Sequence, residues 1–196
     1  MKNGLIACLA VIALPFSLLT ACDTVNDLNP FGGLKKGTPT CPSVKFLKDA
    51  DRITVYKPNT SREISDIIFE AEFTGFKGEC EYFGEDSNYN SVLLSLNLSL
   101  DIIRGPAAKT PNIELNYFIA IPDFFPNPKG KVHFNRVLKF PKGSNSANFV
   151  DETIEITIPL NKNRRGPKTK VLIGFDLSKS QLEFNREPTR GMGLGG

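Results

Sequence analysis

The sequence predicts an all-β fold, a single antiparallel β-sandwich of about seven to eight strands. Three observations predict it. Several segments alternate apolar and polar residues with a period of two, which puts one face of a strand in a core and the other in water. Turn signals such as Gly105-Pro106 and Pro141-Lys142-Gly143 separate these segments. A sheet with one wetted face is typical of antiparallel pairing.

The clearest strand covers residues 91–103, where every second residue from Val92 to Ile102 is aliphatic. The same alternation predicts strands over 69–73, 114–121, 153–160 and 170–177, and shorter ones over 53–57 and 78–83. Residues 131–140 keep the pattern except for Arg136, which favours a bulge or an edge strand. A short helical turn is expected at 46–50 or 178–183. The architecture is immunoglobulin-like, without the buried tryptophan of antibody domains, since the chain has none. A closed β-barrel is the alternative.

The N-terminus reads as an export signal. An apolar run over residues 5–19 follows the single charge of Lys2 and stops at Leu19-Thr20-Ala21-Cys22. The run is shorter than the roughly 20 residues that span a bilayer, so it is typical of a cleaved signal. The four residues at its end resemble the lipobox of bacterial lipoproteins. That resemblance implies that Cys22 is acylated on sulfur and becomes the first residue of the mature chain. An ordinary secretory signal ending near Ala21 is the alternative.

The whole chain is similar to small envelope lipoproteins of Gram-negative bacteria, in which only the lipobox is a specific motif. The resemblance implies a membrane anchor through the Cys22 lipid and a domain that faces the periplasm. Aspartate directly after the cysteine, here Asp23, is a weak sorting signal for the inner membrane, and the choice between the two membranes stays open. We expect a signal peptide at 1–21, a tether rich in Gly, Pro, Asn and Thr at 22–43, the β-domain at 44–184 and a disordered tail at 185–196.

Cysteine usage agrees with export. Of the four cysteines, Cys8 leaves with the signal and Cys22 carries the lipid, so Cys41 and Cys80 remain. Two thiols in an oxidising compartment most simply form one disulfide. The alternative, a metal site, lacks paired-cysteine spacing, and the chain has a single histidine.

Two loops are candidate contact sites. Residues 161–170 carry five positive charges and no acid, on Lys162, Arg164, Arg165, Lys168 and Lys170. We expect a hairpin loop whose cations contact anionic lipid headgroups or an acidic partner; a loop that merely keeps the domain soluble is the alternative.

The second loop is Pro122 to Pro128, which contains Phe124 and Phe125. Two adjacent phenylalanines cannot both point into the core from one strand. We expect both to cap the open end of the sandwich; the alternative is that at least one is exposed in this proline-bracketed loop as an interface anchor.

The sequence lacks the residue sets of an enzyme. His133, the only histidine, is expected on the wet face of its strand with no partner indicated. The acidic run around Cys80 favours a solvated turn over a calcium loop. No cofactor or metal is expected. Removal of Lys2 with the signal lowers the formal charge from +3 to about +2, which argues against nucleic acid as a partner.

These observations favour a lipid-anchored, non-catalytic binding or scaffolding module that contacts another envelope component, most simply a protein. The alternative is a carrier or chaperone for an apolar ligand or an outer-membrane polypeptide. An enclosed apolar cavity would favour the carrier, and a filled sandwich would favour the binding module.

Overall fold

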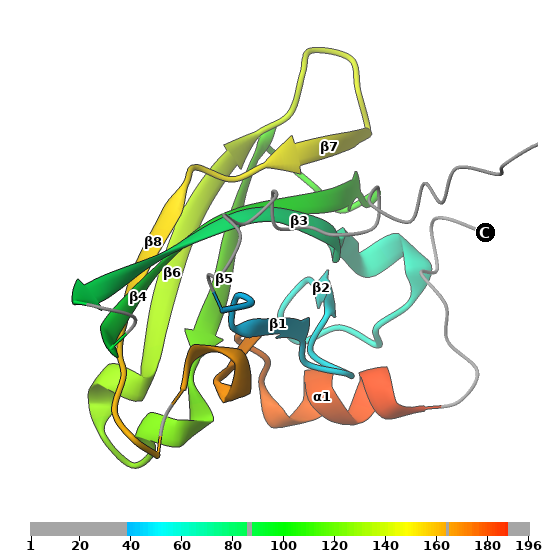
Figure 1. Ribbon diagram of the computed structural model, residues 1–196. Helices are drawn as coiled ribbons and strands as arrows, with labels where there is room; N and C mark the ends of the chain where they lie inside the picture. The colour runs from blue at the N-terminus through cyan, green and yellow to red at the C-terminus, as the bar shows by residue number, and fades with distance from the viewer. Residues whose placement is uncertain (1–38, 86–87, 164, 188–196) are drawn as a thin grey trace, which may run out of the picture.

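The computed structural model describes residues 39–85, 88–163 and 165–187 (Figure 1). The predicted signal peptide, the lipobox with Cys22, most of the tether, Arg164 and the last nine residues of the tail lie outside the described residues. All structural statements below concern the described ranges.

The chain forms two β-sheets that share one hydrophobic core, which confirms the predicted sandwich and rules out the closed barrel (Figure 1). In the four-stranded sheet the order is β1 (Ser43–Phe46), β9 (Lys170–Phe175), β5 (Asn112–Ala120) and β6 (Lys131–Lys139). The five-stranded sheet contains β2 (Arg52–Tyr56), β3 (Ile67–Glu85), β4 (Asn88–Arg104) and β7 (Ser146–Val150), with β8 (Ile154–Pro159) also paired to β4.

The long strand β4 confirms the strand predicted from the alternating leucines, and it lies at the centre of its sheet. Its inward side chains from Val92 to Ile102 are at most 2 % exposed. One edge pairs with β3 along its length, and the other pairs first with β8 and then with β7. Asn97 covers the break between β8 and β7, because its amide donates to the Thr153 hydroxyl at 3.0 Å and to the Asp151 carbonyl at 3.4 Å. With the hydrogen bond of 2.8 Å from the Asp151 amide to the Leu98 carbonyl, these contacts hold the residues of the break against β4.

The structure differs from the expectation in three ways. The predicted strands 69–73 and 78–83 are one strand, β3, because the register shift between Phe73 and Gly75 changes the phase of the alternation without ending the pairing. β1 and β7 were not predicted, since their four and five residues are too short for a clear period. The β1–β9 pair is parallel, although all other pairs are antiparallel.

Aromatic rings fill the space between the sheets. Phe73 stacks on Phe46 at 5.0 Å and on Phe175 at 4.3 Å between ring centroids, and its ring meets Tyr117 edge-on at 5.8 Å. Burial of each such ring stabilises the fold by about 1.5–3 kcal/mol. Because Phe46 comes from β1, this stack also holds the first strand of the domain against the core.

One α-helix, α1 (Lys179–Arg186), packs beside β2, and its N-cap Ser178 forms a capping box with Gln181 (Figure 1). It confirms the helical turn expected near 178–183. Asn185 is buried and donates to the Asp49 and Arg52 carbonyls, both at 2.8 Å. The predicted boundary between domain and tail at 184/185 is therefore wrong, and so is the start at 44, since β1 begins at Ser43. No described helix is long and apolar enough to cross a membrane.

Candidate binding site at one end of the sandwich

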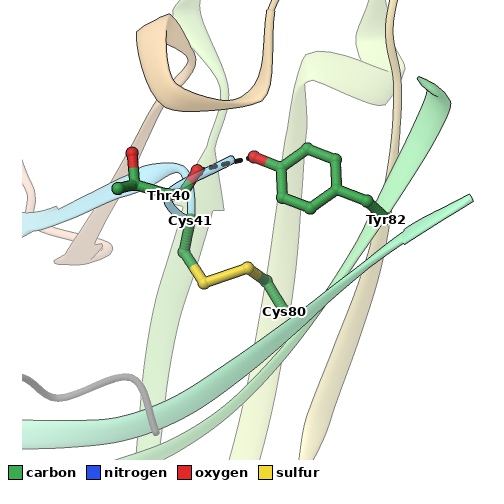
Figure 2. The surroundings of a disulfide bond; sticks show 4 residues. All are labelled: Thr40, Cys41, Cys80 and Tyr82. Carbon is green, nitrogen blue, oxygen red and sulfur yellow. Dashed lines mark hydrogen bonds between the residues drawn. A yellow bond between two sulfur atoms is a disulfide. The ribbon is translucent and has the colours of Figure 1, made fainter. Parts of the chain in front are cut away.

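A disulfide fixes the start of the domain to β3. Cys41 and Cys80 are bonded, as predicted, across 39 positions of sequence (Figure 2). Next to this bond the Tyr82 hydroxyl donates to the Thr40 carbonyl at 2.7 Å (Figure 2). The Ser43 amide donates to the Thr169 carbonyl at 3.0 Å. The chain that leads into the domain is therefore held at one place, between β3 and the segment before β9.

The basic segment is not a hairpin loop, contrary to the expectation. β8 belongs to the five-stranded sheet and β9 to the four-stranded sheet, so residues 160–169 cross from one sheet to the other. Two neighbouring strands in sequence need not pair, and here each finds its partner elsewhere: β8 pairs with β4, and β9 pairs with β5 and β1. We call residues 160–169 the crossing segment.

The crossing segment has a defined backbone. It contains a 3-10 turn, η5 (Gly166–Lys168), in which the Lys168 amide donates to the Arg165 carbonyl at 2.9 Å. The buried Thr169 closes the turn with a hydrogen bond of 3.0 Å to the Gly166 carbonyl. At its other end the Leu160 amide donates to the Asn90 carbonyl at 2.7 Å. The cations on this segment are thus presented from a backbone ordered at both ends.

Gly166 is where the crossing segment meets β3. A β-carbon at this position would lie 2.6 Å from ring carbons of Tyr82 and closer still to its hydroxyl oxygen. Only glycine permits this approach, since any side chain would occupy the space of the ring. The segment is therefore seated directly on Tyr82.

We expect Gly166→Ala to displace Tyr82 and to destabilise the domain by about 1–3 kcal/mol, the usual range for overpacking. Denaturant unfolding measures the change. The matched control is Gly75→Ala, since nothing lies within 4 Å of a β-carbon there. Equal effects of the two substitutions would contradict the packing of Gly166 on Tyr82.

An open groove of about 870 Å³ lies between the crossing segment and the β3–β4 hairpin. Its wall includes two aromatic rings, three cations, three asparagines and Pro39 from the entering chain. The lining residues are Pro39, Tyr82, Asn88, Tyr89, Asn90, Leu160, Asn161, Lys162, Arg165, Gly166, Pro167 and Lys168. None of these described lining residues is an acid, so the groove presents positive charge and hydrogen-bond donors. We call it the basic groove.

The three groove cations have no described ion-pair partner. Lys162, Arg165 and Lys168 are exposed, and the ion pairs among described residues involve none of them. Three like charges on one short segment attract anions and repel one another, which favours an anionic ligand. Arg and Lys are also the side chains that best recognise carboxylate and phosphate groups.

The two tyrosines form the apolar part of the groove. The Tyr82 and Tyr89 ring centroids are 5.1 Å apart, with the planes tilted by 57°. Burial, with a smaller contribution from the charge of Tyr89, raises the pKa of Tyr82 to about 12. Tyr82 is therefore a neutral hydroxyl donor to Thr40 at all ordinary pH values.

The raised pKa of Tyr82 predicts a pH dependence of stability. The folded-state pKa of about 12 lies above the ordinary value of 10.0, so the stabilisation is complete below pH 10 and is lost as the pH rises toward 12. We expect the free energy of unfolding of the wild type to approach that of Tyr82→Phe over this window. Parallel curves for the two proteins from about pH 9 to 12 would contradict the burial of the hydroxyl.

The other predicted contact residues lie as follows. Lys170 is exposed at the start of β9 but does not line the basic groove. Phe124 ends the 3-10 turn η3 (Pro122–Phe124) and packs against the core, whereas Phe125 is 84 % exposed. Phe124 therefore caps the core as predicted, whereas that prediction is wrong for Phe125.

Phe125 and the basic groove lie at the same end of the sandwich. Ala120, the last residue of β5, pairs with Leu172 near the start of β9 and with Lys131 at the start of β6. The connection 121–130 therefore lies at the end of the sheet where the crossing segment enters β9, toward the lower left of Figure 1. We call this the loop end: residues 39–41, the hairpin residues Glu85 and 88–90, the connection 121–130 and the crossing segment.

Sequence reasoning missed the partners of two polar residues. His133 is exposed, as expected, but its Nδ1 lies 2.8 Å from Asp176 Oδ2, and Lys131 Nζ lies 3.6 Å from the other carboxylate oxygen. Arg136 points inward to Asp151, with 2.8 Å between Nε and Oδ1, and Asp151 also accepts a hydrogen bond from the Tyr117 hydroxyl. A charged residue, Arg136, on the otherwise apolar face of its strand was the one available signal for the second network.

Two smaller grooves, each of about 450 Å³, lie elsewhere on the described surface. One is between α1 and β2, and the other is between the edge strands β6 and β8. The described residues contain no group of three side chains that could hold a metal ion. Comparison of the chain with protein-family models, curated proteins and solved structures finds no match.

Proposed function

We propose that this protein is a lipid-anchored, non-catalytic binding module of the bacterial cell envelope that faces the periplasm. Its lipid is carried by Cys22, and its binding site is the basic groove, which takes an anionic envelope component. The support for the anchor is the lipobox-like sequence. The support for the site is the groove's donor set of three cations and three asparagines, with no acid among its described lining residues.

One observation carries the proposal: the chain enters the domain at the edge of the basic groove. Pro39 is part of the groove wall, and Cys41 and Thr40 are held to β3 by the disulfide and by Tyr82. Pro39 is only 17 positions after Cys22. A chain of that length reaches about 60 Å at most when fully extended. A domain anchored through Cys22 thus keeps its basic groove on the side from which its tether leaves.

The packed interior favours the binding module over a carrier. The space between the sheets is filled by aliphatic and aromatic side chains, most of them no more than 5 % exposed. The grooves described above open at the surface instead of enclosing an apolar volume. An apolar ligand of drug size needs several hundred Å³ of enclosed space.

Site-specific photo-crosslinking in the producing bacterium tests the binding site. A photoreactive residue in place of Asn88, in the groove wall, is expected to give adducts that decrease when Arg165 and Lys168 are both changed to Gln. The matched control is the same probe at Ser180, in the groove beside α1. Adducts of equal yield from both positions, or adducts indifferent to the double substitution, would contradict a site in the basic groove.

A further inference from the structure

We propose that the loop end docks directly on the surface of an anionic bilayer, with the groove cations on headgroup phosphates and the Phe125 ring in the interfacial layer. This inference rests on the proposed function and names the anionic component: the phosphate-bearing face of the membrane that holds the anchor. Three features of the described residues meet at this end.

The first feature is charge. At the loop end the described cations Lys129, Lys162, Arg165 and Lys168 outnumber the described carboxylates Asp123 and Glu85. The positive excess is concentrated on the crossing segment, which carries no acid. Basic residues near an anionic bilayer surface each add to binding, and the attraction falls off within about 10 Å.

The second feature is the exposed aromatic ring. Phe125 is 84 % exposed, the most exposed of the described large apolar side chains. It stands between the turns η3 and η4 (Pro128–Gly130), and prolines at 122, 126 and 128 restrict this connection. Gly130 packs under Phe124, since a β-carbon added to this glycine would lie only 3.0 Å from Phe124 Cβ, so the inner phenylalanine fixes the base of the loop. Phe125 is thus held outward on a rigid support, as an interfacial anchor requires.

The third feature is the direction of the entering chain. Residues 39–41 are part of the loop end, held there by the Cys41–Cys80 disulfide and by the hydrogen bond from Tyr82 to Thr40. A tether that leaves from this end lets the loop end approach the membrane, because the tether does not have to run along the side of the domain first. The far end, with Lys48, Ile64 and α1, contains neither the entering chain nor the crossing segment.

The test uses the absence of tryptophan from the chain. The mature, acylated protein with Phe125→Trp is reconstituted in vesicles that contain phosphatidylglycerol and in vesicles of pure phosphatidylcholine, and its emission and its quenching by brominated acyl chains are recorded. We expect a blue-shifted, quenched indole in phosphatidylglycerol and a solvent-exposed one in pure phosphatidylcholine. The matched probe is Ile64→Trp, since Ile64 is 62 % exposed at the opposite end of the five-stranded sheet. It is expected to stay in water in both lipids.

Charge removal provides the second arm. In the Phe125→Trp background, changing Arg165 and Lys168 to Gln should lower the ratio of docked to undocked protein by about fivefold per cation. The control double substitution is Lys48→Gln with Lys179→Gln, which removes two exposed cations from the far end and should change nothing. The docking proposal is overturned if the indole of the Phe125→Trp variant stays in water in phosphatidylglycerol, or if both double substitutions act alike.

Vesicle flotation separates this inference from the proposed anchor. A Phe125→Trp protein that floats with the vesicles while its indole stays in water is anchored and undocked, which overturns only the docking. A protein that does not float with either lipid has no lipid anchor, which overturns the proposed function. A protein that floats with the vesicles and has a buried, quenched indole supports both the docking and the lipid anchor.

Discussion

Replacement of Cys41 and Cys80 by alanine together is expected to lower the free energy of unfolding by about 4 kcal/mol. The disulfide closes a loop of 39 positions and so removes much of the freedom of the unfolded chain. A loss of this size is a large part of the roughly 5–15 kcal/mol that holds a typical domain folded. Denaturant unfolding of the purified proteins at neutral pH measures the difference.

Reduction of the wild type provides the control for the cysteine substitutions. With a thiol reductant present, the wild type should unfold at the same denaturant concentration as the double variant, which should itself be insensitive to the reductant. A loss below about 1 kcal/mol would mean that the β1–β9 pairing and the Tyr82–Thr40 hydrogen bond fix the entering chain without a contribution from the disulfide.

Asp151→Ala is expected to destabilise the domain by about 3–5 kcal/mol, the usual effect of removing one member of a buried pair. Asp151 is only 8 % exposed and lies in the break between β7 and β8. Its carboxylate accepts from Arg136 on β6 and from Tyr117 on β5, so it connects the two sheets. The hydrogen bond to Asp151 raises the pKa of the Arg136 guanidinium, and burial, with that carboxylate, raises the pKa of Tyr117. Removal of the Asp151 carboxylate leaves the partly buried Arg136 cation and the buried Tyr117 hydroxyl without their acceptor.

Asp101 is the matched control for Asp151. It lies on β4, is exposed and accepts a hydrogen bond of 2.9 Å from Asn148. We expect Asp101→Ala to change the free energy of unfolding by no more than about 0.5–1 kcal/mol, because water replaces an exposed partner. Thermal or denaturant unfolding of the Asp151→Ala and Asp101→Ala variants measures the two losses of stability side by side. Similar losses would show that the network between the sheets contributes no more than a surface hydrogen bond.

The fold was predictable where a single strand shows an uninterrupted alternation of apolar and polar residues in its own sequence. β4 buries every second residue from Val92 to Ile102, so its alternation is uninterrupted there and the strand was predicted. β3 was predicted as two strands, because the register shift next to Gly75 changes which residues face the core. β1 is held by its pairing with β9 and by Phe46 in the core, contacts that four residues of sequence cannot reveal.

The candidate site was predictable only in its charges. Lys162, Arg165 and Lys168 were evident from the basic run, but the opposite wall of the groove comes from Tyr82 and Tyr89 on the β3–β4 hairpin, about 80 residues earlier. That juxtaposition depends on β8 pairing with β4, which brings Pro159 beside Ser91. The prediction of a hairpin failed for the same reason, since sheet membership is decided by distant partners.

Polar networks between strands were the least predictable part. The charged Arg136 indicated something unusual in β6, and in the structure its partner is Asp151, in the break between β7 and β8. His133 gave no such signal, since it follows the expected wet face of β6 and its partner Asp176 comes just after β9. A single sequence does not say which strands become neighbours, so it cannot assign partners across a sheet.

The mass of the mature protein extracted from bacterial membranes tests the central claim, the lipid anchor, most directly. We predict a chain that begins at Cys22 and carries the added mass of acyl groups on that residue, with Cys41 and Cys80 two hydrogens lighter in their disulfide. A chain that begins elsewhere, or an unmodified cysteine at its start, would contradict the anchor and with it the orientation of the loop end toward a membrane.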